Sequence, residues 1–575
     1  MCGIVGIVSK NFFNSKDIMT LLKRLEYRGY DSFGYADPNG NEKKIIGNID
    51  PLKVKDFKTK TAICHTRWAT HGRVNEANAH PQTDCKKNIF VVHNGIIENY
   101  LDIKNKLIEK GHSFVSDTDT EIISHFIENA ISENKSMEEA LQDFISVAEG
   151  TFAFLVIRKG IDKIYAAKRD SPLVLGIMKD GIIIGSDIYA FSNKTNDAIW
   201  IDNNEYLVLD KEGFEIFNSD GVKIEKQIKK FKWEDELQNN QKKYEHHMIK
   251  EIHEIPTVAN RLLLSLDQEQ EKTLAELVSA AKNASKVLFV AAGTSYHTSL
   301  LGAYFLNRAG IDTRTMIASE FKNYTFLDDK TLVIAISQSG ETMDVIEALK
   351  TAKKHHAKIT SIVNSPYSTI QRMSEISLNI LAGQEICVAA TKTFVNQVIV
   401  LLALSSELGW KTHYKKISQE LENVFTHEDK IKDMALSLTN KKDIYIIGRG
   451  MAYPISREIA LKLKEISYKH AEGMMGGELK HGTLALIEEG TSVIGLVDNK
   501  EIISNLKEVE ARGGSISVIS DTETEFPGFL LNTSDEASFA LCATMVGQLL
   551  TYYIAKNNSL PIDKPRNLAK CCTVK

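Results

Sequence analysis

An internal repeat in the C-terminal half of this 575-residue chain limits its possible folds more than any other feature. In each copy an apolar segment, 286–292 or 442–447, leads into a glycine-containing loop and a helical pattern. A second apolar segment follows, 331–337 in the first copy and 491–497 in the second. Alternating apolar strands and helices are typical of doubly wound parallel sheets, which bind ligands at the carboxyl ends of their strands. The repeat therefore predicts two α/β domains in tandem.

Length, charge and cysteine usage exclude several classes of protein. The length favours about three or four domains. A net charge of −5 lacks the excess of basic residues that is typical of nucleic-acid-binding proteins. The seven cysteines are scattered without a C-x₂-C pair, which argues against a disulfide framework or a zinc site. Lys10 and Asp17 interrupt the first apolar run, and no stretch is long enough to span a membrane. We expect a cytoplasmic protein without metal, cofactor, nucleic-acid partner or membrane anchor.

Cys2 directly follows the initiator methionine, and glycines at positions 3 and 6 leave room around it. If Met1 is removed, Cys2 carries a thiol with a usual pKa of about 8.5 beside an amine of about 7.7–8.0. The amine can then take the thiol proton near neutral pH, as in N-terminal nucleophile enzymes. Taken alone, Cys2 could equally be a small residue at the start of a buried strand.

Residues 2–217 show short apolar runs bounded by turn residues, with few helical patterns. We expect strands over 3–9, 61–66, 90–93 and several short segments of 151–217, with helices over 18–27 and 121–131. Asn94-Gly95 is a strong turn pair and predicts the end of the third of these strands. The pattern predicts an α+β layered domain of two packed sheets flanked by helices.

Polar residues near these strand ends suit hydrolysis of a carboxamide. A cysteine that attacks a carboxamide creates an oxyanion, which Asn94 and Gly95 could stabilise through an amide side chain and a backbone N–H. Arg67 could grip the carboxylate of an amino acid, and Asp119 its ammonium group. Each residue also has an ordinary structural alternative. Asn94-Gly95 could form a simple turn, Arg67 could belong to a surface ion pair, and Asp119 could be the N-cap of a helix.

Five motifs occur in one order in this half: Cys-Gly-Ile-Val-Gly, Tyr-Arg-Gly-Tyr-Asp-Ser, His-Thr-Arg-Trp-Ala-Thr-His-Gly, His-Asn-Gly and Thr-Asp-Thr-Glu. Together they resemble the glutaminase domain of the N-terminal-nucleophile amidotransferases. The resemblance implies that Cys2 is the nucleophile, that Asn94 and Gly95 form the oxyanion hole, and that Arg28 belongs to the framework. It also implies a glutamine site that includes Arg67, Trp68, Thr70, His71 and Asp119, with Trp68 gating a passage for ammonia.

The segment 218–271 is rich in charge and predicts a linker followed by a long helix. His246, His247 and His253 raise the possibility of a metal site in this segment. The sequence after His253 does not match H-E-x-x-H, and no cysteine lies nearby. Solvated helix faces are the interpretation that we prefer for these histidines.

Ser337-Gln338-Ser339-Gly340-Glu341-Thr342 joins a predicted buried strand to a helix. Its hydroxyls and backbone N–H groups would converge where the helix dipole favours an anion. An ordinary Ser/Thr N-cap is the alternative, but several hydroxyls together favour a phosphate. The loop lacks the Gly-Lys-Ser/Thr of a P-loop, and Gly448-Arg449-Gly450 lacks the third glycine of a dinucleotide fingerprint. A phosphorylated metabolite is therefore favoured over ATP or a nicotinamide cofactor.

Further motifs resemble a tandem pair of sugar-isomerase domains, namely Gly293-Thr294-Ser295, 337–342, 385–389, 462–465, 477–482 and 565–570. Joined to the glutaminase half, they resemble the isomerising glutamine–fructose-6-phosphate aminotransferase family. The resemblance implies glutamine and fructose 6-phosphate as substrates and a homodimeric enzyme. It divides the chain into 2–217 (glutaminase), 218–271 (linker and helix), 272–425 and 426–560 (isomerase domains) and 561–575 (catalytic tail).

The same resemblance assigns roles in the sugar site. Lys570 would form an imine with the open-chain ketose, His481 would assist ring opening, and Glu465 would move the proton between C1 and C2. Without the motif, Lys462 and Glu465 could be a surface ion pair on one helix face. The residues expected to surround the sugar phosphate are Thr294, Ser295, Ser337, Gln338, Ser339 and Thr342, with Val388 lining the sugar.

Two other functions compete with this one. An ATP-using amidotransferase of the same N-terminal class should contain a Ser-Gly-Gly-x-Asp-Ser loop, which this sequence lacks. A regulatory protein whose tandem domains only sense a sugar phosphate would not require Cys2 or Lys570. An assay for glucosamine 6-phosphate distinguishes an enzyme from such a sensor.

Overall fold

The computed structural model describes residues 2–69, 72–232, 244–324 and 326–570. The chain forms two compact units. The first comprises the chain up to Asp235 together with its last described residues, Ala569 and Lys570, and the second comprises residues 236–568.

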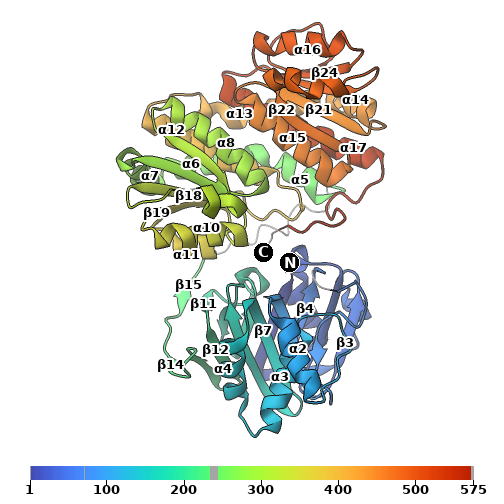
Figure 1. The fold of residues 1–575 in the computed structure, drawn as a ribbon, viewed down its shortest axis with the longest axis vertical. Coiled ribbons are helices and arrows are strands. Elements are labelled where there is room, and N and C mark those ends of the chain that lie inside the picture. The colour runs from blue at the N-terminus through green and yellow to red at the C-terminus, as the bar shows by residue number, and fades with distance from the viewer. Residues whose placement is uncertain (1, 70–71, 233–243, 325, 571–575) are drawn as a thin grey trace. The chain divides into compact units, whose positions relative to one another are not determined.

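The first unit contains two antiparallel sheets, visible in the blue to green part of Figure 1. The order of the eight-stranded sheet is β15 (Lys229–Lys230), β11 (Asp197–Trp200), β9 (Val174–Met178), β10 (Gly181–Gly185), β1 (Gly3–Asn14), β4 (Lys58–Arg67), β2 (Ser32–Ala36) and β3 (Glu42–Ile46). The order of the seven-stranded sheet is β14 (Lys223–Ile224), β13 (Gly213–Phe217), β12 (Glu205–Asp210), β8 (Ile161–Arg169), β7 (Gly150–Arg158), β6 (Ile89–Ile97) and β5 (Gln82–Thr83). The predicted layered α+β domain is confirmed.

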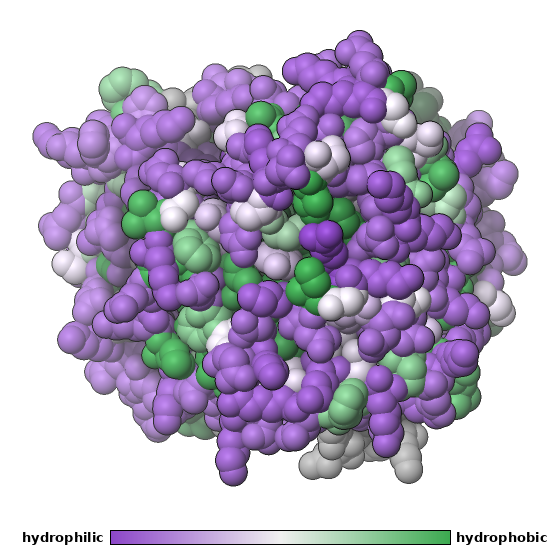
Figure 2. Space-filling model, turned by 90° about the horizontal axis from the view of Figure 1, so that it is seen from below, coloured by the Kyte–Doolittle hydropathy of each residue, from purple (hydrophilic) through white to green (hydrophobic). Residues whose placement is uncertain are grey.

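Apolar side chains from both faces of the seven-stranded sheet build the core of this unit. On one face, Val92 and Leu155 pack with Ile184 of the other sheet. On the other face, Phe152 and Phe154 pack against helices. The helices of the unit are α1 (Ser15–Lys23), α2 (Tyr100–Glu109), α3 (Glu121–Ser132) and α4 (Met137–Val147). Figure 2 shows one face of the molecule, where hydrophilic side chains predominate and apolar ones are interspersed among them.

The predicted turn at Asn94-Gly95 is wrong. β6 continues through both residues to Ile97, and they pair with Ala153 and Phe152 of β7. β7 pairs with both residues, and this strand pairing overrides their local preference for a turn. The oxyanion-hole candidates therefore lie on a sheet, and a sheet fixes a backbone N–H more rigidly than a loop does.

The second unit contains two parallel five-stranded sheets, in yellow-green and orange in Figure 1. The first has the order β17 (Thr313–Ile317), β16 (Lys286–Ala291), β18 (Thr331–Ser337), β19 (Lys358–Val363) and β20 (Ile376–Asn379). The second has the order β22 (His470–Met475), β21 (Asp443–Gly448), β23 (Ser492–Val497), β24 (Ser515–Ser520) and β25 (Gly528–Leu530). The two orders correspond strand for strand, which confirms the repeat. In each sheet the order reverses beside the first strand, and this is where α/β sheets bind ligands.

One continuous apolar core joins the two repeats, with members such as Leu301, Leu401, Ile459 and Val546. Its longest helix, α17 (Glu536–Asn557), is long and apolar enough to cross a membrane, but 94% of its apolar window is buried within the protein. Such burial is typical of a core helix. The other helices are α8 (Gly293–Arg308), α9 (Phe321–Tyr324), α10 (Met343–Lys354), α11 (Thr369–Met373), α12 (Lys392–Leu408), α13 (Ile417–Val424), α14 (Glu428–Leu438), α15 (Ala452–Ser467) and α16 (Ile503–Glu510).

The segment between the halves differs from the prediction of a linker and one long helix. Its first part adds β14 and β15 to the edges of the two sheets of the first unit. Its second part forms two helices, α5 (His247–His253) and α6 (Ile255–Leu266), and α7 (Glu271–Asn283) begins where the segment ends. Proline at the second position of α6 suits a helix start, because its missing N–H would be unsatisfied there anyway. Residues 233–243 lie outside the described part of the chain.

The histidines of this segment are packed, so the prediction of solvated helix faces is wrong. His253 stacks on Phe425 with ring centroids 4.2 Å apart and lies 3.6 Å from the Glu428 carboxylate. The His246 ring lies 3.2 Å from the Tyr552 hydroxyl. Packing against α14 and α17 explains these histidines without a metal ion.

Candidate active sites

Cys2 lies at the start of β1, beside the end of β4. The register pairs Gly3 with Thr66, so Cys2 lies beside the segment that contains Arg67 and Trp68. The Trp68 N–H donates to Cys2 Sγ at 3.3 Å, and the thiol lies 3.4 Å from the Trp68 carbonyl. Burial raises the pKa of the Cys2 thiol. A thiol with a raised pKa needs a base before it can attack, and a freed α-amine on the same residue could act as that base.

Arg67 and Asp119 are both buried, so the alternative of a surface ion pair for Arg67 is wrong. Burial lowers the pKa of Arg67, while the negative charges of Cys2, Asp31 and Asp119 act in the opposite direction. Asp119 Oδ2 accepts the N–H of Ile97 at 2.9 Å, and the residue at the N-cap of α3 is Thr120. A cation and an anion thus lie near the thiol, as the predicted amino-acid site requires. Thr70 and His71 lie outside the described residues.

Gly95 is required by its surroundings, and Asn94 has an unused polar atom. The φ of Gly95 is +127°, and a Cβ at this position would lie 2.1 Å from the Thr151 carbonyl oxygen. Side chains rarely adopt this conformation, so glycine is favoured. Asn94 Oδ1 is buried without a hydrogen-bond partner in the part of the chain that the structure describes. A buried amide with spare hydrogen-bonding capacity is suited to a polar ligand.

Three buried histidines on and beside these strands were missed by the sequence analysis. The rings of His65 and His80 are 4.1 Å apart, and His65 Nε2 donates to the His93 carbonyl at 3.0 Å. His93 Nδ1 lies 2.9 Å from Thr120 Oγ1, at the start of α3. Burial lowers the pKa of His65 to about 3 and that of His80 well below its usual range. These histidines connect β4, which carries Arg67, and β6, which carries Asn94, to the start of α3 beside Asp119.

Arg28 supports the start of β1. Its guanidinium donates to the Ser186 carbonyl at 3.0 Å and lies 4.0 Å from the Asp187 carboxylate. Ser186 in turn accepts the Ile4 N–H at 3.2 Å through its hydroxyl and donates its own N–H to the Ile4 carbonyl. This agrees with the predicted role of Arg28 in the framework of the site.

The loop from Ser337 to Thr342 brings its hydroxyls together at the start of α10. Ser337 Oγ lies 3.1 Å from Thr342 Oγ1 and accepts the Gly340 N–H at 3.0 Å. Ser339 Oγ accepts the Glu341 N–H at 3.1 Å. Thr342 is the N-cap residue, but among the described residues its hydroxyl does not cap the helix. The Thr342 hydroxyl is therefore not used as a helix cap. The loop lies where the strand order reverses, which is a position that suits an anion.

Thr294 belongs to a buried charge network. Its hydroxyl accepts a hydrogen bond from Lys462 at 3.0 Å and donates one to Glu458 at 3.0 Å. Lys462 also pairs with Glu465 at 2.6 Å, and His297 pairs with Glu458 at 2.7 Å. Lys462 is 1% exposed, so the alternative of a surface pair is wrong.

Charge compensation controls the protonation of this network. Burial alone would lower the pKa of Lys462, but Glu458 and then Glu465 outweigh burial and raise it. Burial would raise the pKa of Glu458, but Lys462, His297 and Thr294 together outweigh burial and lower it. A charged Lys462 thus orients the half-buried Glu465 carboxylate, and no hydrogen bond joins the exposed His481 to Glu465 among the described residues.

Hydrogen bonds to neighbouring segments hold Val388 and Ser295 in place. The Val388 N–H donates to the Asp563 carbonyl at 3.2 Å, which connects the predicted sugar-lining loop to the C-terminal tail. Two buried carboxylates hold the loop: Glu251 accepts from Cys387 N–H at 3.2 Å, and Glu385 accepts from Thr393 N–H at 3.2 Å. Ser295 Oγ accepts from the Gln397 side chain at 3.0 Å.

The tail from 561 to 570 is non-helical, as predicted, and up to Leu568 it belongs to the second unit. Asp563 accepts the N–H groups of His247 and Met248 at the start of α5, at 2.8 and 2.9 Å. The Arg566 guanidinium lies 4.2 Å from the Tyr468 ring centroid, and the Arg566 N–H donates to the Tyr468 hydroxyl at 2.8 Å. These contacts hold the segment that precedes Lys570.

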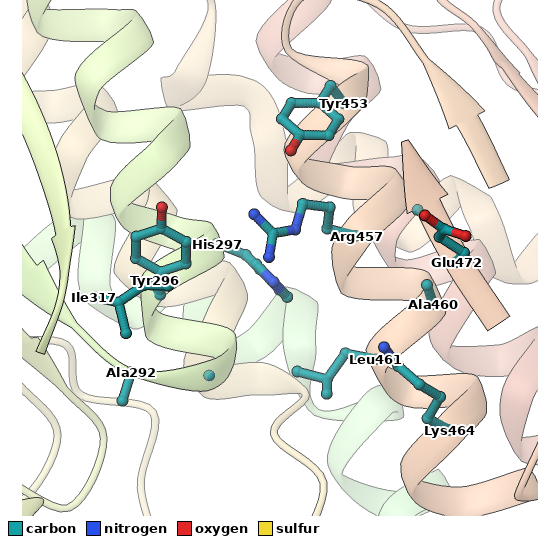
Figure 3. Close-up of a pocket in the computed structure, with 12 residues that line it drawn as sticks. Ala292, Tyr296, His297, Ile317, Tyr453, Arg457, Ala460, Leu461, Lys464 and Glu472 are labelled. Carbon is teal, nitrogen blue, oxygen red and sulfur yellow. The ribbon is translucent and has the colours of Figure 1, made fainter. Parts of the chain in front are cut away.

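A cavity of about 590 Å³ lies between α8 and α15, where the two repeats meet. Figure 3 shows Tyr296 and His297 on one wall facing Tyr453 and Arg457 on the other. The Arg457 guanidinium lies 5.7 Å from the Tyr296 ring centroid. This cavity is distinct from the hydroxyl-rich loop after β18, and the sequence analysis did not predict it.

The second repeat offers a poorer place for an anion at the matching position. Asp498 follows β23, and burial raises the pKa of its carboxyl group to about 6. Glu501 lies beside it and pairs with Arg449 of the first strand-end loop at 3.1 Å. Arg449 is thus already neutralised, and the carboxylates oppose a phosphate.

Comparison with known proteins supports both halves. Residues 65–193 match the family model for a glutamine amidotransferase domain, and residues 282–406 and 437–555 match the SIS domain model. The second unit resembles the C-terminal domain of glucosamine-fructose-6-phosphate aminotransferase from Francisella tularensis, with a TM-score of 0.52 and 32% identity. That match covers 57% of this chain and 100% of the other. Tagatose-6-phosphate ketose/aldose isomerase from Escherichia coli shares the fold, at 16% identity and a TM-score of 0.50 over 56% of this chain and 97% of that one.

Full-length relatives share the whole arrangement. The chain is 40% identical to the isomerising glutamine–fructose-6-phosphate aminotransferase of Thermococcus kodakarensis, and the match covers 100% of both chains. It is 39% identical to proteins of the same name from Methanothermobacter thermautotrophicus and Thermotoga maritima, again over 100% of each chain. At this identity over the full length, the chain belongs to the isomerising glutamine–fructose-6-phosphate aminotransferase family.

Proposed function

We infer that this enzyme transfers the amide nitrogen of glutamine to fructose 6-phosphate and isomerises the product to glucosamine 6-phosphate. Glutamate is the second product, and the reaction supplies amino-sugar biosynthesis. The observation that carries this function is the full-length family match of a chain with Cys2 at the start of one unit and a hydroxyl-rich anion loop in the other.

In the first unit, the Cys2 thiolate would attack the carboxamide carbon of glutamine. The oxyanion that forms would be stabilised by hydrogen bonds from the Asn94 side-chain NH₂ and the Gly95 N–H. Arg67 and Asp119 would bind the carboxylate and ammonium groups of the substrate, with Trp68, Thr70 and His71 completing the site. Ammonia leaves, and water then hydrolyses the thioester to glutamate and free thiol.

In the second unit, Ser337, Gln338, Ser339 and Thr342 would bind the phosphate group at the start of α10, and Val388 would line the sugar. Thr294 and Ser295 border this region, since β16 and β18 are adjacent in the sheet. Through its bonds to Lys462 and Glu458, Thr294 would act as a positioning residue.

The isomerisation requires a base and an electron sink. Glu465, oriented by Lys462, would move a proton between C1 and C2. Lys570 would provide the sink as an imine with the ketose, with water as the other product of imine formation. His481 would protonate the ring oxygen during ring opening. The support for Lys570 is the anchored tail that precedes it, and for His481 it is the family resemblance alone.

We also propose the division of the chain into 2–217, 218–271, 272–425, 426–560 and 561–575, with the edge strands β14 and β15 completing the first domain. The enzyme would act as a cytoplasmic homodimer without a nucleic-acid partner or membrane anchor. Sedimentation equilibrium tests the dimer, and a monomer at micromolar concentration would contradict it.

The function is tested by incubating the purified enzyme with glutamine and fructose 6-phosphate and measuring glucosamine 6-phosphate. Cys2→Ala should abolish glutamine hydrolysis but keep synthesis from high ammonium, because the sugar site uses other residues. Absence of product from the wild-type enzyme, or loss of both activities in a folded Cys2→Ala variant, would contradict the proposal.

A further inference from the structure

Four metal-binding side chains converge on the first unit, away from the residues proposed for catalysis. They are Cys85, in the loop after β5, His112, in the loop after α2, and His125 and Glu128, both on α3. One ligand atom of each residue lies within 4.8 Å of the ligand atoms of all the others. His125 and Glu128 share one face of α3 because they are three residues apart.

The separations between these atoms are close to those of a tetrahedral zinc site. Cys85 Sγ lies 3.5 Å from His125 Nδ1 and 3.7 Å from His112 Nδ1. Glu128 Oε2 lies 3.0 Å from His112 Nδ1 and 3.4 Å from His125 Nδ1. Zinc bonds of about 2.0–2.3 Å in tetrahedral geometry place the ligand atoms about 3.3–3.6 Å apart. We propose that Cys85, His112, His125 and Glu128 bind one structural zinc ion.

The surroundings of His125 favour this arrangement. His125 Nδ1 faces the cluster, while its Nε2 lies 3.4 Å from Glu121 Oε1. A histidine that binds zinc through one nitrogen usually donates the other N–H to a carboxylate, which fixes its tautomer. The Phe114 ring lies 4.4 Å from the His125 ring and partly covers it. His125 is 1% exposed, so its orientation is fixed by packing.

The charges of the site also suit a divalent cation. On binding, the Cys85 thiol loses its proton to solvent, and the thiolate and the Glu128 carboxylate then balance the two charges of Zn²⁺. Two neutral histidines, one thiolate and one carboxylate form a closed four-ligand set, which is typical of structural zinc sites.

The proposed zinc ion would connect three segments that are far apart in the sequence. It would fasten the β5 loop and the α2–α3 connection to α3. Glu121 continues this support, because its carboxylate accepts the N–H groups of Val115 and Ser116 at 2.8 and 2.7 Å. The same connection leads to Asp119 at the start of α3. The sequence analysis excluded zinc for want of a C-x₂-C pair, and these ligands are too widely spaced to match a sequence pattern.

Zinc binding is measured on the full-length protein after removal of bound metal and dialysis against Zn²⁺. We expect one zinc ion per chain by elemental analysis, and a higher unfolding temperature with zinc than without it. Cys85→Ser should weaken zinc binding by at least about tenfold. Cys85 is exposed, so this variant should fold. Glu133→Gln, on the same helix but paired with Lys110 at 2.9 Å, should bind zinc as the wild type does.

Cobalt distinguishes this site from metal bound at Cys2. Replacing Zn²⁺ with Co²⁺ should give a thiolate-to-cobalt charge-transfer band and the intense visible bands of tetrahedral cobalt. Both should persist in Cys2→Ala and disappear in Cys85→Ser. A wild-type protein that binds no stoichiometric zinc, or a Cys85→Ser variant with unchanged affinity and spectrum, would overturn the proposal.

Discussion

Gly95 shows how one residue can limit a whole site. A Cβ at this position would lie 2.1 Å from the Thr151 carbonyl oxygen, on a backbone with φ of +127°. The clash is with main chain, which cannot rotate away, so β6 and β7 would have to separate. The proposed oxyanion hole would be displaced with them.

Gly95→Ala should therefore destabilise the first unit by about 3 kcal/mol or more and abolish glutaminase activity. Gly47→Ala is the matched control, since Gly47 also has a positive φ of +94° but no atom within 4 Å of its would-be Cβ. It should cost only about 1–2 kcal/mol. Calorimetry of both variants measures the loss in the free energy of unfolding. Synthesis of glucosamine 6-phosphate from ammonium should be retained in both. Equal losses of stability and of glutaminase activity in the two variants would contradict this prediction.

The buried histidines predict how stability depends on pH. The folded-state pKa of His65 is about 3, whereas an unfolded histidine has a pKa of about 6.5. Above about pH 6.5 neither state binds the proton, so stability is fully present. Below that pH only the unfolded state binds the proton. The free energy of unfolding therefore falls as pH decreases toward 3, by about 1.4 kcal/mol per pH unit for each such histidine.

Calorimetry between pH 7.5 and 4.5 should show the transition of the first unit moving to lower temperature below about pH 6.5. His65→Asn should flatten this dependence, while His355→Asn, in the second unit, should not change it. A transition temperature that stays constant down to pH 5 would show that these histidines are not kept neutral.

Among single residues, those to which a motif assigns a role could be predicted and the others could not. Cys2, Arg67 and Asp119 lie near one another, as their motifs led us to expect. His65 and His93 lie in two of the quoted motifs and His80 lies in none, but the sequence assigned no role to any of them, because their importance comes from strand register and burial. Asn94-Gly95 misled the prediction since the pairing of β6 with β7 overrides the local turn preference.

At the scale of elements, the parallel strands were predicted well because their apolar runs are long and regular. The predicted strand 331–337 is β18 without change, and 286–292 differs from β16 by one residue. The predicted long helix was wrong, because charge and helical spacing do not show where tertiary packing divides a helix. Two helices formed where the prediction had one.

The contrast between the two strand-to-helix loops predicts one sugar-phosphate site per chain. The loop after β18 offers hydroxyls and helix N–H groups, whereas the loop after β23 offers Asp498 and Glu501. Calorimetric titration with fructose 6-phosphate should give one site per chain. Thr342→Val should weaken binding about tenfold through the lost hydroxyl, and Thr522→Val, in the second repeat, should not. Two equivalent sites per chain would contradict this prediction.

The tail predicts where the sugar is held covalently. Contacts of Asp563 and Arg566 anchor the segment before Lys570. Reduction with borohydride in the presence of fructose 6-phosphate should therefore label Lys570, and Lys570→Ala should lose both label and sugar turnover while keeping glutamine hydrolysis. Lys462 is the internal control, because its two carboxylate partners keep it charged. Labelling of Lys462, or an active Lys570→Ala variant, would contradict the assignment.

At the scale of the whole molecule, two folds with separate chemistry occur in one chain. The first unit holds the residues proposed for glutamine hydrolysis, and the second holds Glu465 and the loop proposed to bind the sugar phosphate. The sequence predicted both units because the nucleophile motifs and the repeat occupy separate stretches. It could not predict the cavity between α8 and α15, which depends on how the two repeats pack.

The central claim is that nitrogen released at Cys2 is transferred to the sugar. It is tested by supplying glutamine labelled with ¹⁵N in its amide, fructose 6-phosphate and an excess of unlabelled ammonium, and measuring the isotope in glucosamine 6-phosphate by mass spectrometry. The account predicts product that carries the label from the wild-type enzyme and only unlabelled product from Cys2→Ala. Wild-type product without ¹⁵N, or labelled product from Cys2→Ala, would contradict it.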